Sequence, residues 1–501
     1  MKFNYSSLIK SLILILVLVA VQLVSFISPS TPAMADNYGG EIYPQGELQA
    51  GQTVYLPFLT GVRHTVISGP SSTIPRVNAP YFEGDILYPE TAIFWFGKVN
   101  PTENYAQVRV GFNQQELSIN LAAFDRQQWF DTVPSPTTLT EWDAVTVYLA
   151  TEDGSAYRFV GQFDNNSNNE EEARAKYQAV YKKQGSSWST VSIPFSTRTA
   201  WRGTNPNNNS GEERGWVITF KIPFSSLGMS GKPKDGANWK MGVVMHDRDD
   251  AAGTSIPDKW WPLNFTGDNT STWGELFFGI PSYNPPAISQ VETVIIRHKL
   301  NGAVVVDGEV GGGSICGDGL DFWKEWGDKS YPGNQDNSDF NVQNQSDIAD
   351  WPCFARYYVT FKLDSLPQGK AIADAKVTLH QMGSSGGGSW GAADKSLIQI
   401  FTVGDDWDEG TLTWNNSPHA VENVSSAWVY PVEQFPGWPG IPWTWDISRA
   451  VAQAYESGEP LRLAVYSADS AYHSGKYFVS SDTGDWNAQA RPTLEIKLGN
   501  P

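Results

Sequence analysis

Cysteine and histidine are scarce in this chain, and their scarcity excludes several kinds of chemistry. Only two cysteines and six histidines occur among 501 residues. A zinc site needs clustered His or Cys ligands, and the sequence contains no such cluster. A Ser-His-Asp hydrolase is not indicated either, since no G-x-S-x-G elbow is present. Met245 and His246 are neighbours in an expected strand and would point to opposite faces, so they cannot ligate one haem iron together.

Basic residues are also fewer than acidic ones. The chain has 35 Lys and Arg against 54 Asp and Glu, which gives a formal net charge of -19. Such a chain has no basic stripe that could neutralise phosphates, so nucleic acid is excluded as a partner. The acidity suits an extracellular protein in contact with divalent cations, although it could equally serve solubility alone.

Helical periodicity is nearly absent. The best candidate for a helix is "DISRAVAQAYESG" (446–458), which Gly458 would terminate. The composition instead favours β structure, because aromatic residues reach 13%, glycine occurs 46 times and charged residues amount to only 18%.

Residues 1–35 have the pattern of a secretory signal peptide. Lys2 and Lys10 precede an apolar run at 12–21, and "AMA" at 33–35 fits a cleavage site. No later segment is long and apolar enough to span a membrane. We therefore expect a secreted, extracellular or cell-surface protein, with the periplasm as an alternative.

A proline-rich linker at 281–289 divides the remaining chain into two expected domains, 37–280 and 290–499. Short apolar or alternating segments separated by turn-rich loops predict an all-β fold with two antiparallel, jelly-roll-like β-sandwiches in tandem. The clearest strands are "AQVRVGF", "ELSINLAAF", "DAVTVYLAT", "AYRFVGQF", "GWVITFKIPF", "WKMGVVMHD" and "GELFFG".

The first domain resembles family 9 carbohydrate-binding modules and the wider DOMON-like sandwiches. The resemblance covers most of 75–279 and depends on the order of its segments: "VRVGFNQQELSINLAAFDRQQW", "EWDAVTVYLATEDG", "GWVITFKIPFSSLG" and "WKMGVVMHDRDDAAGT". It implies a β-sandwich that binds carbohydrate.

The second domain resembles the DNRLRE domain, which is related to carbohydrate-binding module family 96. Four motifs carry this resemblance in family order, at 355–380, 407–418, 443–458 and 475–496. The resemblance implies that Trp407 and Trp414 pack within the sandwich. It does not include Asp405 and Asp406.

Calcium is the cation that best matches the acidic loops, because it takes six to eight oxygen ligands from carboxylates, amides and carbonyls. The candidate ligands are Asp247, Asp249 and Asp250 in "HDRDD" and Asp405 and Asp406 in "GDDWDEG". None has EF-hand spacing, and each group could instead be a solvated turn.

A disulfide between Cys316 and Cys353 is the expected role of the only two cysteines in an exported chain. A metal site or a catalytic thiol is disfavoured, since neither cysteine lies in a C-x-x-C motif or beside a histidine.

Polysaccharide is the partner predicted for the exposed aromatic residues. Sugar binding needs ring faces for stacking and nearby polar side chains for the hydroxyls. Trp260 and Trp261 are the first candidates, and Trp438 and Trp443 are candidates in the second domain, although any of them could be core residues.

We therefore predict a non-catalytic polysaccharide-binding protein with structural calcium. A polysaccharide lyase or glycoside hydrolase with an acidic cleft is one alternative. A structural or adhesive surface protein is the other.

Overall fold

A computed structural model describes residues 74–165, 170–210, 213–254, 256–311, 321–330, 338–344, 354–386, 392–469 and 474–501. All of them belong to one compact unit. Residues 1–35, Cys316 and Cys353 lie outside the described residues, so the signal peptide and the disulfide stay predictions. No helix among the described residues is long and apolar enough to cross a membrane.

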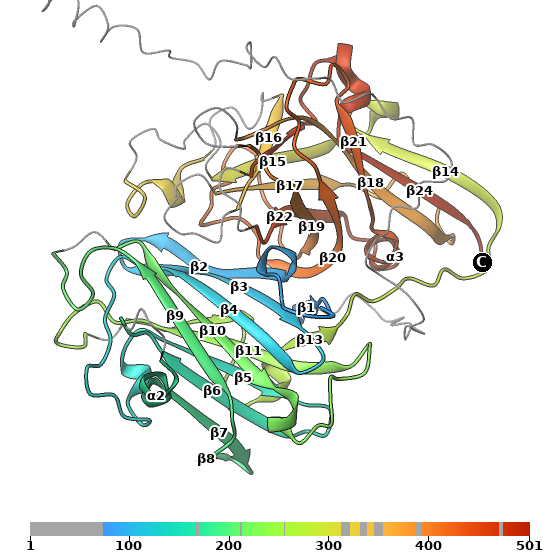
Figure 1. Cartoon of the computed structure of the whole chain (residues 1–501). Helices are drawn as coiled ribbons and strands as arrows, with labels where there is room; N and C mark the ends of the chain where they lie inside the picture. The colour runs from blue at the N-terminus through green and yellow to red at the C-terminus, as the bar shows by residue number, and fades with distance from the viewer. Residues whose placement is uncertain are drawn as a thin grey trace, which may run out of the picture. The chain divides into compact units, whose positions relative to one another are not determined.

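The prediction of an all-β sandwich fold is confirmed, with 45% of the residues in strands and 11% in helices. In the first half, one sheet has the order β2-β3-β4-β10-β9, and it faces β13-β11-β5-β6-β7-β8 with β12 beside β11 (Figure 1). The strands are β2 (Ala92–Asn100), β3 (Glu103–Phe112), β4 (Glu116–Phe124), β5 (Ala144–Ala150), β6 (Ala156–Gln162), β7 (Gln178–Gln184), β8 (Ser187–Thr190), β9 (Ser196–Arg202), β10 (Gly215–Pro223), β11 (Asn238–His246), β12 (Lys259–Trp261) and β13 (Gly274–Phe278).

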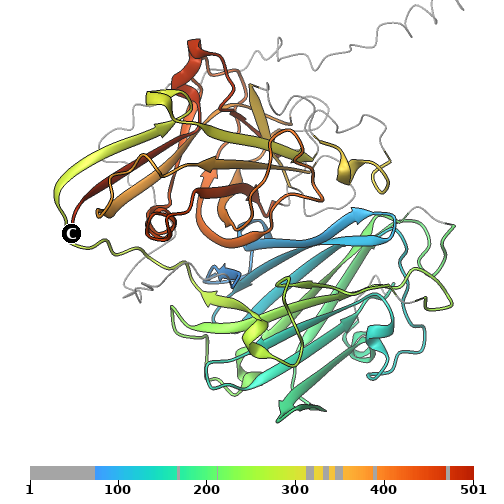
Figure 2. The same cartoon turned by 180° about the vertical axis from the view of Figure 1, so that it is seen from behind.

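The second half forms another pair of sheets, β14-β24-β18-β23-β16 with β21 beside β18, and β15-β17-β22-β19-β20 (Figure 2). Its strands are β14 (Ser289–Arg297), β15 (Val305–Gly311), β16 (Asp339–Val342), β17 (Ala355–Phe361), β18 (Ala371–Ser384), β19 (Ser396–Val403), β20 (Ala420–Val429), β21 (Ile441–Asp446), β22 (Leu461–Ser467), β23 (Lys476–Val479) and β24 (Thr493–Asn500).

Helices are few and short among the described residues. The helix predicted at 446–458 is α3 (Ser448–Ser457), and Gly458 ends it with a φ of 71° while its N–H bonds to the carbonyls of Ala454 and Tyr455. The others are α2 (Glu171–Arg174), η10 (Asp485–Ala490) and 3₁₀ turns at Tyr88–Glu90, Leu139–Glu141, Ala175–Tyr177, Phe224–Leu227, Thr270–Thr272, Leu300–Gly302 and Trp326–Asp328.

Strand β1 (Arg76–Ala79) joins the two halves. It pairs in parallel with β13 along its full length and contacts β20 through the pair Arg76 and Glu422. One sheet of 13 strands therefore runs through both sandwiches. All other described strand pairs are antiparallel, and the division into domains at 281–289 stays a prediction.

A third hydrophobic cluster lies between the cores of the two sandwiches. It unites Trp95 and Tyr105 of the first half with Trp414 and Tyr466 of the second, all buried. Arg356 lies within this cluster, and its guanidinium carbon is 4.0 Å from the Trp414 ring centroid and 4.3 Å from that of Trp95. The two sandwiches thus share a buried aromatic layer that holds one cation.

The stretch 405–416 illustrates how family motifs support the fold. Trp414 is buried, and the backbone N–H of Thr413 donates to Asn416 Oδ1. Asn415 reaches the first sandwich, where its side chain bonds to both the N–H and the carbonyl of Val99. Trp414 packs as expected, but in the layer between the two sandwiches and not in the core of the second one.

Candidate functional site

Three exposed rings, Phe435, Trp438 and Trp486, gather on the second sandwich and form what we call the aromatic cluster. Their exposed fractions are 50%, 43% and 68%. The ring centroids of Trp438 and Trp486 are 4.8 Å apart at 82°, and those of Phe435 and Trp438 are 5.0 Å apart at 69°. Large apolar surfaces of this kind are expensive to expose and usually mark a binding site.

Glycines hold the Trp438 loop close to β18. Gly440 has a φ of 97°, and a Cβ there would lie 2.7 Å from the carbonyl oxygen of Gln381. Its N–H donates to the carbonyl of Gly437, which also has a positive φ. Any other residue at 440 would push the loop away from the sheet and move Trp438.

Trp486 is held on the other side by η10. Arg491, which is buried, donates to the carboxylate of Asp485 at 2.6 Å and to the carbonyl of Thr483. Gly484 leaves room for the indole, because a Cβ there would lie 2.6 Å from Trp486 Nε1. The chain is therefore fixed on both sides of Trp486, and its ring stays in solvent.

Polar groups lie beside the aromatic cluster. The Lys299 ammonium is 3.6 Å from the Asp485 carboxylate. His380 of β18 lies next to Gly440, and its partial burial lowers the pKa of its ring. Its Nδ1 is buried without a hydrogen-bond partner. The exposed Lys299 and Asp485 can bond to the hydroxyls of a sugar whose ring stacks on the indoles, whereas the buried Nδ1 of His380 cannot reach one.

Of the two tryptophans that the sequence predicted here, Trp438 belongs to the cluster and Trp443 supports its surroundings. Trp443 is half-buried, and its Nε1 donates to Gln381 Oε1 at 2.8 Å. It stacks on Tyr430, which is 55% exposed. Sequence reasoning missed Phe435 and Trp486, although Trp486 was visible as a Trp in a turn-rich "TGDWN" segment.

The expected pair of exposed tryptophans in the first half is corrected to one. Trp260 is 40% exposed, whereas Trp261 is only 3% exposed and packs on Phe94 with ring centroids 4.3 Å apart. The two exposures differ because Trp260 and Trp261 are neighbours in strand β12, and neighbouring residues of a strand point to opposite faces.

A first acidic cluster forms where β4 and β11 end. Carboxylate oxygens of Asp125, Asp247 and Asp249 lie within 4.8 Å of one another. Burial and the neighbouring carboxylates raise the pKa of Asp125 to about 7 and that of Asp249 to about 6. Burial, with Asp125 close by, also raises the pKa values of Asp143 and Asp247 well above the usual range.

Asp250, the third predicted ligand in this loop, lies outside the first acidic cluster. Its carboxylate accepts hydrogen bonds from the N–H and the hydroxyl of Thr254, and these bonds lower its pKa. It closes a turn, and its role as a ligand stays a prediction.

A second acidic cluster unites Asp307, Glu409 and Asp482, whose carboxylate oxygens also lie within 4.8 Å of one another. Asp307 is fully buried and accepts from the Tyr357 hydroxyl at 2.5 Å and from Ser481 N–H at 2.7 Å. Burial is the main cause that raises the pKa values of Asp307 and Glu409, each to about 7. The three residues of the second acidic cluster come from distant parts of the chain, so local sequence patterns could not reveal this cluster.

Asp405 and Asp406 are exposed and belong to neither acidic cluster of the described residues. Asp406 instead pairs with Arg462 at 2.6 Å. The prediction that these two residues ligate a metal stays a prediction, and Glu409 of the same loop is the residue that belongs to the second acidic cluster.

Both acidic clusters fit a hard divalent cation. Calcium–oxygen distances of about 2.3–2.6 Å place neighbouring ligand oxygens within about 5 Å of each other, as these carboxylates are. Asp247 Oδ1 is buried without a hydrogen-bond partner, which is costly unless a cation meets it. The raised pKa values have a related cause, because buried carboxylates without a positive charge between them repel one another and bind protons more tightly.

Comparison with known proteins finds a family model that matches most of the sandwich with the aromatic cluster. Residues 331–497, about a third of the chain, match the model of carbohydrate-binding module family 96. This confirms the resemblance predicted for the second half. No curated protein matches the chain.

Solved structures similar to this chain include a protein from Bacteroides uniformis described as a candidate carbohydrate-binding protein, with 13% identity over 41% of this chain and 100% of that one (TM-score 0.30). Others show a family 9 carbohydrate-binding module from Caldicellulosiruptor kristjanssonii. Its complex with cellotriose has 13% identity over 41% of this chain and 93% of that one (TM-score 0.27). Its complex with glucose has 14% identity over 42% and 98% (TM-score 0.27).

Proposed function

We propose that this protein is exported and binds polysaccharide without cleaving it, through the aromatic cluster on its second sandwich. The observation that carries this proposal is the position of three exposed rings inside the segment that matches family 96, where Trp438 contacts both Phe435 and Trp486. Rings at such angles offer both faces and edges, and sugar rings stack on exactly such apolar surfaces while their hydroxyls reach polar neighbours.

The acidic clusters are better suited to cations than to glycoside cleavage. Asp125 is 1% exposed and Asp307 is 0% exposed, and each accepts a hydrogen bond from a backbone N–H. A general acid or nucleophile must reach the glycosidic oxygen or the anomeric carbon of a substrate. These buried carboxylates could not do so without rearrangement of the loops around them.

Affinity electrophoresis across a panel of polysaccharides tests the proposed function. We expect retardation on at least one glycan and no new chain ends. If no glycan retards the protein, the proposal that it binds polysaccharide is wrong. If reducing or unsaturated ends are released, the protein cleaves the glycan, and the lyase or hydrolase alternative replaces the non-catalytic one.

We expect calcium to raise the melting temperature by several degrees, since one site at a hundredfold excess over its Kd contributes about 2.7 kcal/mol. Differential scanning calorimetry of the chelated and the calcium-loaded protein measures the effect. Asp247→Asn should reduce it, whereas Asp250→Asn is the matched control in the same loop and should keep it. An unchanged melting temperature after chelation would contradict the calcium sites.

The effect of calcium should grow with pH between about 5 and 8. The folded, metal-free protein holds protons on Asp125, Asp249, Asp307 and Glu409, whose pKa values are raised to about 6–7. Raised carboxylate pKa values stabilise the metal-free fold at low pH, and this contribution is lost as pH rises through the folded pKa. Calcium must displace these protons, so its added stability is small at pH 5 and large at pH 7.5. Calorimetry at both pH values checks this, and an effect that falls as pH rises would contradict it.

A further inference from the structure

A cleft of about 1040 Å³ lies between the two sandwiches. Its walls come from the β12 loop (260–264), from the β19 and β20 ends (402–406 and 419–422), and from α3 with the start of β22. Its volume is at the upper end of the range of about 300–1,000 Å³ that is usual for ligand pockets. It has room for several linked sugar rings and is distinct from the aromatic cluster, none of whose residues line it.

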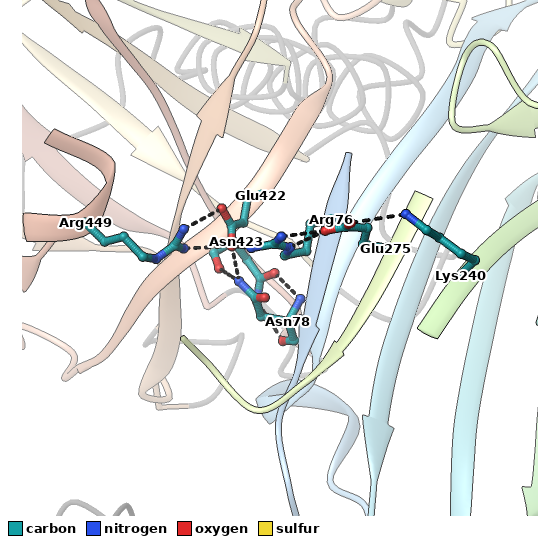
Figure 3. Close-up of polar contacts among 7 residues, drawn as sticks. All are labelled: Arg76, Asn78, Lys240, Glu275, Glu422, Asn423 and Arg449. Atoms are coloured by element: carbon teal, nitrogen blue, oxygen red, sulfur yellow. Dashed lines mark hydrogen bonds and ion pairs between the residues drawn. The ribbon is translucent and has the colours of Figure 1, made fainter. Parts of the chain in front are cut away.

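A network of charges fixes the inner wall of the cleft (Figure 3). Arg76 of β1 donates to Glu275 at 2.8 Å and lies 3.5 Å from Glu422 of β20. Arg449 of α3 makes two bonds to Glu422, at 2.7 and 3.0 Å, and Asn78 donates to it at 2.8 Å. These side chains are largely buried and satisfy one another, so they hold the walls in place before a ligand enters.

Trp260 supplies an aromatic wall. Its indole Nε1 already donates to the carbonyl of Leu263 at 2.9 Å, which fixes the orientation of the ring. The ring is still 40% exposed, and Leu263 beside it is 60% exposed. What Trp260 presents to the cleft is therefore apolar ring surface, while buried Trp261 supports the strand from behind.

Another part of the lining is polar and acidic. Asp406 and Glu459 both lie against Arg462, at 2.6 and 3.4 Å. Asp405 is exposed and has no hydrogen bond or ion pair within the part of the chain that the structure describes. Burial is the main cause that lowers the pKa of His419 to about 4, so its ring is uncharged at neutral pH. Three carboxylates thus face one guanidinium in this part of the lining.

We propose that this cleft is a second carbohydrate site, which takes an uncharged oligosaccharide with one sugar ring on Trp260 and its hydroxyls donating to Asp405. An anionic chain such as a uronate would meet the surplus carboxylates and is disfavoured by their repulsion. The assignment of the ligand to carbohydrate rests on the proposed function, whereas the site itself rests on the cleft. With the aromatic cluster as the other site, one chain binds glycan at two places and gains avidity on a polymer.

Isothermal titration calorimetry on the full chain tests this inference. The probes are cellohexaose, mannohexaose and xylohexaose, with an oligogalacturonate of similar length as the anionic counterpart. We expect two sites for at least one uncharged probe. Trp260→Ala should weaken one site at least tenfold and spare the other, and Trp438→Ala should do the reverse. Asp405→Ala removes an exposed carboxylate without a partner, so it should weaken the Trp260 site without unfolding the chain.

The outcomes separate the two proposals. A single site that Trp438→Ala abolishes, and that Trp260→Ala and Asp405→Ala leave unchanged, overturns the cleft site and keeps the proposed function. Oligogalacturonate bound as tightly as the uncharged probes at the Trp260 site overturns the assigned ligand class. Absence of binding of every probe, with retardation on a polysaccharide that Trp260→Ala leaves unchanged, overturns the cleft site and keeps the proposed function.

Discussion

Replacing Trp438 and Trp486 together with alanine should weaken the binding of a retained polysaccharide by roughly 30-fold or more. Each exposed ring is expected to contribute about 1–2 kcal/mol through apolar area removed from water and favourable ring contacts. The two rings touch each other, so their contributions are not additive. Either single variant should already cause more than half of the loss of binding free energy that the double variant shows. Affinity electrophoresis, which gives the retardation as a function of glycan concentration, measures the loss.

Leu87→Ala is the matched control for this double variant. Leu87 is 51% exposed and lies in the first half of the chain, outside the aromatic cluster. It should leave retardation unchanged. A folded double variant that still migrates like the wild type on every retained glycan would show that the aromatic cluster does not bind carbohydrate.

Replacing Arg356 with alanine should lower the free energy of unfolding by about 3–5 kcal/mol, the range for large cavities in a core. The guanidinium lies against Trp95 and Trp414, and it donates to the Tyr105 hydroxyl and to Ser417 Oγ. Its removal leaves a void and deprives buried polar atoms of donors. Because the residue lies between the two sandwiches, urea unfolding should also become less cooperative.

Two variants separate the charge of Arg356 from its volume. Arg356→Met fills most of the space without hydrogen bonds and should cost less than Arg356→Ala. Lys376→Met removes a partly exposed ion pair with Asp374 and should change stability by about 1 kcal/mol or less. If Arg356→Ala cost no more than Lys376→Met, the buried cation would not be what stabilises the layer between the sandwiches.

The sequence determined seven strands of the first half and, among the residues that the structure describes, the helix α3. The segments around β3, β4, β5, β6, β10, β11 and β13 alternate or run apolar because their residues face a core, and the structure places strands at all of them. Gly458 marked the end of α3 because only a residue that tolerates positive φ closes a helix in this way. The motif order of the second half predicted the resemblance to carbohydrate-binding module family 96 that the match of residues 331–497 confirms.

Long-range pairing decided the rest. Whether Trp260 or Trp261 faces solvent depends on how β12 lies on β11, which no local pattern fixes. The second acidic cluster draws Asp307 from within β15, Glu409 from the loop after β19 and Asp482 from the loop after β23, so only the packed sheets reveal it. Likewise, β1 reaches both sandwiches, and Trp260 and Asp405 line one cleft although the sequence had assigned them to different domains and different ligands. A residue's type sets what it can bind, but the neighbours that make it a site come from contacts between parts of the chain that are hundreds of residues apart.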